Sequence, residues 1–191
     1  MKTKLLLAVC IAFFGCSGDN DSPADGNSPD SISNTLHMSF TTSDWDRFIN
    51  CEKLDLYPVS VNETTSTVSA TSASTAETFC FSIPVDSSAM VSPSNLKKYA
   101  IATYFDNSAP FQFSQKLPVT SGSSTYLVSI GGLTEESYNE VTEIKYIGKE
   151  TNYSLFTVKC RYKMLAYPIG DETTVKAISG TFHFKVRTSR K

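Results

Sequence analysis

The chain has 191 residues, with 17 Lys and Arg against 19 Asp and Glu, and 40% of its residues are hydrophobic. A net charge of −2 gives no global field that would recruit nucleic acid or an anionic membrane surface. The composition therefore excludes a nucleic-acid-binding protein, and the length suits one domain with a single core.

The first residues have the pattern of an export signal. Two lysines precede an apolar run of ten residues, Leu5 to Phe14, which is about half the length of a membrane span. The run ends in Phe13-Phe14-Gly15-Cys16, which resembles a lipobox, the cleavage site of signal peptidase II. Cys10 is the competing site, but bulky Val9 precedes it and cleavage there would leave part of the apolar run in place. We predict that residues 1–15 are removed and that Cys16 carries the lipid.

A polar segment follows the cysteine and gives nothing to bury. Residues 17–30 hold only Ser, Gly, Asp, Asn, Pro and Ala, so we predict that residues 16–34 are a lipidated, flexible tether. Asp21 and Asp25 have EF-hand spacing, but Pro23 and Ile32 occupy two ligand positions, so no metal site is predicted.

Two short motifs of this tether resemble those of Bacteroidetes lipoproteins. Serine and acidic residues directly after Cys16 resemble the surface-export signal of that phylum. Asp30-Ser31-Ile32 resembles its O-glycosylation acceptor, with Ser31 as the modified residue. The resemblance implies a protein anchored in the outer membrane, facing the cell surface or else the periplasm.

The remainder, residues 35–191, alternates apolar and polar side chains with period 2, and no segment keeps helical spacing. We predict a single all-β domain of 8–9 strands, arranged as a two-sheet antiparallel sandwich or a flattened barrel. The predicted strands are Leu36 to Thr41, Leu54 to Val61, Phe79 to Val85, Tyr99 to Phe105, Phe111 to Val119, Tyr126 to Ile130, Val141 to Ile147, Tyr153 to Ala166 and Ala177 to Arg187.

A long loop is predicted from Val61 to Thr78, because that stretch is mostly Ser, Thr and Ala. With the nearby Asp44 to Phe48 segment it forms one candidate partner site. Trp45, the only tryptophan, has a competing role as a core residue between the first two strands.

Three cysteines remain in a compartment that permits disulfides, so at most one bridge forms. Cys160 shares its face with Phe156, Val158 and other apolar residues, which indicates a buried thiol. We therefore predict a disulfide between Cys51 and Cys80, with three free thiols as the alternative.

The last two strands are predicted to form a hairpin with one apolar and one basic face. If Cys160 lies opposite Phe184, then Lys159 faces Lys185 and Arg161 faces His183. Lys159, Arg161, Lys185 and Arg187 would then form a basic stripe that binds anionic groups, unless acids such as Glu143 neutralise it or the side chains simply extend into water.

The ending Ile178-Ser179-Gly180-Thr181-Phe182-His183-Phe184, after a long strand and a polar loop, resembles the closing hairpin of small uncharacterised Bacteroidetes lipoproteins. Some of these are described as lipocalin-like. The resemblance covers the signal and about the last 40 residues, and it implies an outer-membrane β domain without a known active site.

Catalytic motifs are missing from the sequence. It contains no HExxH, CxxC or Gly-x-Ser-x-Gly pattern, and its two histidines, His37 and His183, lie in alternating strand patterns. We predict that the protein is not an enzyme and uses no cofactor. Two functions compete: a binding module for a glycan, an apolar ligand or a partner protein, and a structural or assembly accessory lipoprotein of the cell envelope.

Overall fold

The computed structural model describes residues 31–189, so the predicted signal peptide, Cys16 and the tether up to residue 30 lie outside it. Strands make up 52% of the structure and helices 4%, which confirms the all-β class. No helix within the described range is long and apolar enough to cross a bilayer. The elements are β1 (His37–Thr41), β2 (Asp46–Asn50), β3 (Val59–Ser60), β4 (Thr65–Thr71), β5 (Thr78–Pro84), α1 (Ser87–Met90), a 3-10 helix (Pro93–Asn95), β6 (Lys98–Tyr99), β7 (Phe113–Pro118), β8 (Tyr126–Ser129), β9 (Tyr138–Lys149), β10 (Tyr153–Pro168) and β11 (Lys176–Ser189).

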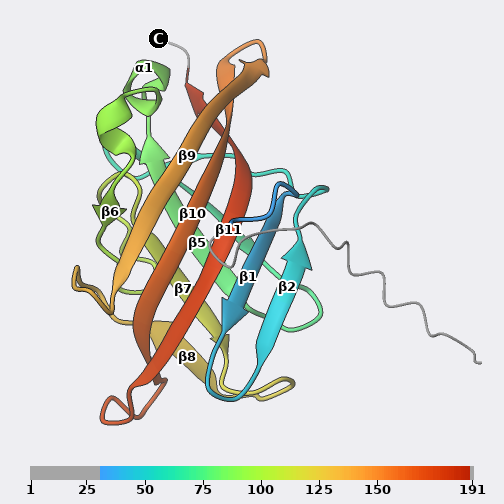
Figure 1. The fold of residues 1–191 in the computed structure, drawn as a ribbon, viewed down its shortest axis with the longest axis vertical. Helices are drawn as coiled ribbons and strands as arrows, with labels where there is room; N and C mark the ends of the chain where they lie inside the picture. The colour runs from blue at the N-terminus through green and yellow to red at the C-terminus, as the bar shows by residue number, and fades with distance from the viewer. Residues whose placement is uncertain (1–30, 190–191) are drawn as a thin grey trace, which may run out of the picture. The chain divides into compact units, whose positions relative to one another are not determined.

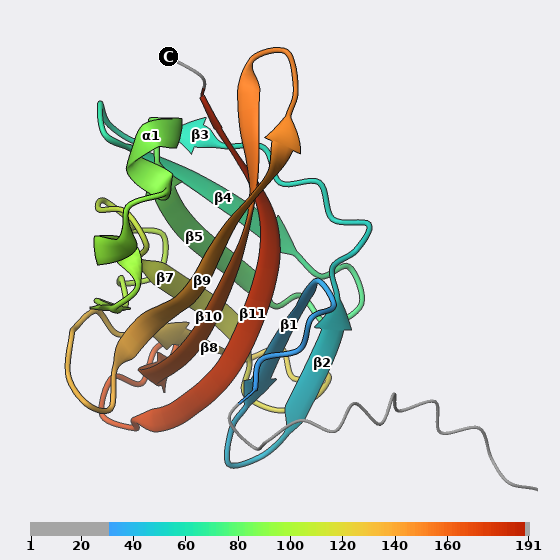
Figure 2. The same cartoon turned by 45° about the horizontal axis from the view of Figure 1, so that its top comes forward.

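The strands form one antiparallel sheet that curls into a half-barrel, with the order β2-β1-β11-β10-β8-β7-β5-β4-β3. Figure 1 shows the long strands β9, β10 and β11 side by side, with β5 and β7 behind them. One edge of β10 pairs with β11 along nearly its whole length, and the other pairs first with β9 and then with β8. Figure 2 shows how β4, β5 and β7 form the opposite wall.

Aromatic rings fill the inner face of the curled sheet, the face that carries the hydrophobic core. Phe182 stacks between Phe184 and Phe113, with ring centroids 4.5 and 5.0 Å apart. Phe184 also stacks on Phe79 of the opposite wall at 4.5 Å. Packed side chains therefore occupy the concave side, where a lipocalin would hold its ligand.

Strand β5 is buried along its whole length, because both of its faces are covered. Phe79 and Phe81 point into the core, whereas Cys80 and Ser82 face outward beneath residues 103–112. The hydroxyl of Ser82 donates to the carbonyl of Ala109 at 2.6 Å, which holds this loop against the sheet.

Three segment predictions were wrong. The Val61 to Thr78 stretch, predicted as an exposed loop, contains β4, which pairs with β5 over seven residues. Small side chains are sufficient for β4 to form, because Val68 and Ala70 are its only hydrophobic residues that contact the core. Of the predicted strand Leu54 to Val61, only β3 is a strand. The predicted strand Tyr99 to Phe105 is not formed beyond β6, because the chain turns there and the backbone N–H of Asp106 donates to the carbonyl of Thr103.

The predicted Cys51–Cys80 disulfide was also wrong, because Cys51, Cys80 and Cys160 are all free and buried. Cys51 belongs to the inner-face core, whereas Cys80 lines a groove on the outer face. The sheet therefore separates the two sulfur atoms. Cys160 is a buried core thiol, as predicted.

Candidate functional site

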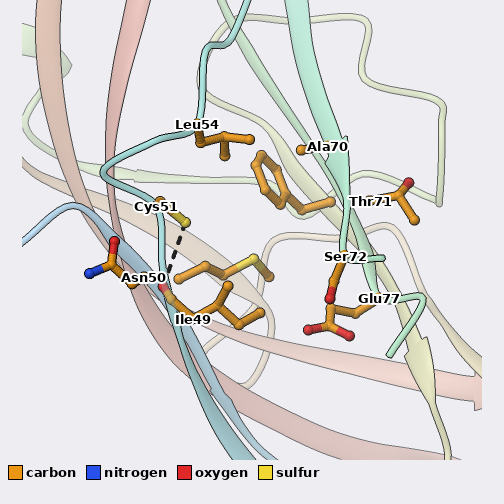
Figure 3. A pocket seen from close by; sticks show the side chains of 10 residues that line it. Ile49, Asn50, Cys51, Leu54, Ala70, Thr71, Ser72 and Glu77 are labelled. Carbon is orange, nitrogen blue, oxygen red and sulfur yellow. Dashed lines mark hydrogen bonds between the residues drawn. The ribbon is translucent and has the colours of Figure 1, made fainter. Parts of the chain in front are cut away.

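A small pocket lies at the seam of the half-barrel, where β1 and β2 meet β4 and β5. We call it the seam pocket; Figure 3 shows the side chains that line it, with the Cys51 thiol bonded to the carbonyl of Ile49. Its volume is about 90 Å³. Ligand pockets usually measure about 300–1,000 Å³, so the seam pocket has less than a third of the usual volume. Its lining residues are Met38, Ile49, Asn50, Cys51, Leu54, Ala70, Thr71, Ser72, Glu77 and Phe79.

Side chains hold this seam together. The guanidinium of Arg47 on β2 lies 3.4 Å from the buried carboxylate of Glu77 and donates to Ser74 at 3.0 Å. Arg47 and Glu77 also both bond to the hydroxyl of Thr75. The seam pocket therefore lies at the contact that joins β2 to the turn between β4 and β5.

A larger groove of about 290 Å³ lies on the outer face, between β3 and the loop of residues 103–112. We call it the outer groove. Small side chains form its floor, since Thr67, Ser69 and Cys80 all project outward from β4 and β5. Its full lining is Val59, Val61, Thr67, Ser69, Cys80, Phe105, Asp106, Asn107 and Ser108.

Both rims of the outer groove are apolar and exposed. Val59 is 69% exposed on the β3 side, and Phe105 is 63% exposed on the loop side. Phe105 adopts φ +67°, a left-handed backbone conformation that costs a bulky residue about 1–2 kcal/mol. Exposed apolar groups and local strain gather at binding sites.

The loop that carries Phe105 is fixed by hydrogen bonds of the Asn107 and Gln112 side chains. Asn107 donates to the carbonyl of Gln112 at 3.1 Å and accepts from Ser114 at 2.6 Å. The Gln112 side chain accepts from the backbone of Ser108 and Ala109, both at 2.9 Å. Phe105 is therefore presented on a rigid support.

The polar character of the outer groove is mainly hydroxyl. The Thr67 hydroxyl is buried without a hydrogen-bond partner among the described residues. Asp106 is the one charged lining residue, and none of the lining residues is basic. The groove thus suits a neutral ligand that offers both apolar carbon and hydroxyl groups.

The hairpin register differs from the prediction by two residues. Cys160 pairs with Phe182, so Lys159 lies opposite His183 and Thr157 opposite Lys185. Lys159 also lies 3.7 Å from Glu143, and Arg161 lies 4.0 Å from Glu140, both on β9. Acids on the adjoining strand therefore pair with two members of the predicted stripe.

Arg187 is buried at 4% exposure and has a structural role. It donates to both carboxylate oxygens of Glu150, at 2.8 and 3.1 Å, and bonds to Asp55. Its guanidinium also lies 4.3 Å from the ring of Tyr57. The bond to Glu150 first, and then Asp55, raise the pKa of Arg187, while burial opposes the shift. The structure does not present Lys159, Arg161, Lys185 and Arg187 as one open anion site.

Two other residues predicted as sites, Ser31 and Trp45, lie in different environments. Ser31 is exposed, and Trp45 packs edge-on against Phe40 while its indole donates to the carbonyl of Pro118 at 3.1 Å. Trp45 therefore has the core role that competed with a partner site. Within residues 31–189, no group of three His, Cys, Asp or Glu residues is arranged to hold a metal ion.

Sequence reasoning missed Phe105, Val59 and Val61 as site residues. A signal for Phe105 was present, because a bulky aromatic directly precedes the turn Asp106-Asn107-Ser108. An aromatic at a turn has little chance of burial, which makes it a candidate contact residue.

Comparison with protein-family models, curated protein sequences and solved structures found no match to this chain.

Proposed function

We propose that the protein is a lipid-anchored, non-catalytic binding module of the outer membrane that takes a neutral glycan in the outer groove. The observation that carries this proposal is Phe105, which is exposed, held in a left-handed conformation and set above a groove floored with hydroxyl groups.

A sugar ring has the two chemical characters that the outer groove offers. Its C–H face packs on an aromatic ring, and its hydroxyls exchange hydrogen bonds with exposed hydroxyl groups such as that of Ser69. Because no lining residue is basic, the groove favours neutral over anionic sugars. Because core side chains fill the concave face of the sheet, a ligand site on the outer face is favoured.

Glycan binding is tested with the mature protein in detergent on an array of neutral and anionic oligosaccharides. We expect neutral ligands to bind, and Phe105→Ala to weaken their binding about two- to tenfold, since aromatic stacking contributes about 0.5–1.5 kcal/mol. The matched control is Phe48→Ala, because Phe48 is 57% exposed but lies outside the groove. Equal binding by the Phe105→Ala variant and the wild type would contradict the proposal.

The anchor is tested separately by cell fractionation. Wild-type protein should partition with membranes, because a diacyl or triacyl lipid makes release unfavourable. Cys16→Ala should release the protein or leave it unprocessed. Wild-type protein found wholly in the soluble fraction would refute the lipid anchor and would leave the glycan proposal unaffected.

A further inference from the structure

Two histidines lie side by side beneath the segment that enters the sheet. His37 on β1 pairs with His183 on β11, and His183 in turn lies opposite Lys159 on β10. All three occur on the outer face, since their neighbours Met38, Phe182 and Cys160 belong to the core. His37 is nevertheless 1% exposed and His183 7% exposed. Something must therefore cover this part of the outer face.

The cover is the short segment of residues 32–36, which we call the strap. Asn34 accepts a hydrogen bond from the ammonium of Lys159 at 2.6 Å. The carbonyl of Thr35 bonds to the His37 ring at 2.9 Å, and the carbonyl of Leu36 accepts from the Cys51 backbone at 2.8 Å. From the other side, the ring of Phe48 on β2 stacks on His37 with centroids 4.9 Å apart.

The two rings differ in their hydrogen bonding, and that of His183 favours its neutral form. The other nitrogen of His37 bonds to the Thr181 hydroxyl at 2.9 Å. Both ring nitrogens of His183 are buried without a hydrogen-bond partner among residues 31–189. A second proton on His183 would therefore place a charge in a dry site with no acceptor of normal geometry.

The positive charge of Lys159 also disfavours protonation of the two rings. Among residues 31–189, the cations on this face come from Lys159 and Arg161 on β10 and Lys185 on β11. Glu143 and Glu140 on β9 pair with Lys159 and Arg161. The residue opposite His37 on β2 is Asn50, and the strap itself contains no charged residue.

The pKa of each histidine is lowered. For His37 burial is the largest cause, opposed by the bond to Thr35, and Lys159 lowers the pKa further. For His183 burial is again the largest cause, followed by the charge of Lys159, while the nearby carbonyls of Thr35 and Asn34 oppose the shift. The strapped state therefore binds fewer protons than a state in which both rings meet water.

We propose that residues 32–36 are an acid-released strap, which protonation of His37 and His183 detaches from the outer face of β1, β11 and β10. Because the folded pKa values are depressed, the strap is fully held above the ordinary histidine pKa of about 6.5 and loosens as pH falls below it. Release would take up at most two protons, so the opening equilibrium rises by up to about 100-fold per pH unit. Under the proposed function, release adds up to about 17 Å of extended chain between the anchor and β1.

Hydrogen exchange measured by mass spectrometry on the mature protein in detergent, at pH 7.5 and 5.0 and corrected for intrinsic rates, tests this proposal. We expect protection of the Cys51 amide, which donates to Leu36 of the strap, to fall more than tenfold at pH 5.0, while β10 and β11 stay protected. A double variant, His37→Asn with His183→Phe, removes both titrating rings and should lose the acid response. Asn34→Ala keeps both rings but removes the Lys159 contact, so it should open more at pH 7.5 and keep the response.

Three results would overturn the proposal. The first is a Cys51 amide whose protection does not change between the two pH values. The second is a simultaneous loss of protection in all strands, which would mean global unfolding. The third is an acid response as large in the double variant as in the wild type. Should the double variant fail to fold, NMR titration of the two histidine rings decides: ordinary pKa values for both refute the strap.

Discussion

Replacing Gly180 with alanine tests the tightest contact between β1, β10 and β11. A Cβ atom on Gly180 would lie 2.0 Å from the carbonyl oxygen of Ser39 and 2.7 Å from the hydroxyl of Tyr162. Ordinary contact begins near 3.4 Å, so β1 must move by more than 1 Å and the Tyr162 ring must shift as well. Tyr162 is fully buried and donates to Ser39 at 3.0 Å, so neither movement is cheap.

The expected loss follows from these contacts. Overpacking costs about 1–3 kcal/mol, and a lost hydrogen bond in the β1–β11 ladder adds about 1 kcal/mol. We therefore expect Gly180→Ala to lower the free energy of unfolding by about 3 kcal/mol, or the Tm by about 6–12 °C for a domain of this size.

Urea unfolding followed by tryptophan fluorescence measures this loss, because Trp45 packs on Phe40 of β1. The control is Ser179→Ala, a change at an exposed neighbour, which should stay within about 0.5 kcal/mol of the wild type. A Gly180→Ala variant that unfolds within 1 kcal/mol of the wild type would refute the packing of Tyr162 against Gly180.

Two other substitutions and one chemical measurement follow from the same structure. Arg187→Ala should destabilise the domain by about 2 kcal/mol in urea unfolding, because it removes a buried guanidinium with two carboxylate partners. Lys185→Ala, on the same strand, should change stability by less than about 0.5 kcal/mol, and equal effects of the two changes would refute a structural role for Arg187. Burial raises the pKa of Cys51 and of Cys80 to about 11. At pH 8 a thiol reagent should therefore modify Cys51, Cys80 and Cys160 only after denaturation. If fewer than three of these thiols react in the denatured, unreduced protein, a disulfide is present.

The sequence predicted which face of most strands is buried, and the structure confirms this for β10 and β11. Phe156, Val158 and Cys160 point into the core from β10, and Phe182 and Phe184 do so from β11. Side chains alternate with period 2, so the burial of one face is visible in the order of residues alone.

The register of that hairpin was not predictable in the same way. A shift of two residues keeps every side chain on its face, so the apolar pattern fits either register equally well. The turn decides between them: β10 continues to Pro168 and β11 begins at Lys176, which places Ala166 opposite Lys176. The predicted pairing of Lys159 with Lys185 therefore failed, although both residues are on the face predicted.

Strand β4 could not be found from its own residues. Its sequence, TSTVSAT, has one large apolar side chain, and its strand conformation comes from pairing with β5 and β3. The same small residues leave room on the outer face, which is why a segment predicted as a loop became the floor of the outer groove.

The position of Phe105 follows from how β5 is covered. Because the inner face of β5 is in the core, its outer residues Cys80 and Ser82 need a second cover, which the loop of residues 103–112 provides. The side chains of Asn107 and Gln112 bond to the backbone of this loop, and the loop leaves Phe105 exposed and in a left-handed conformation. Glycine at this position would avoid both the strain and the exposed ring. A ligand that contacts the ring would offset both costs, which supports the outer groove as the binding site.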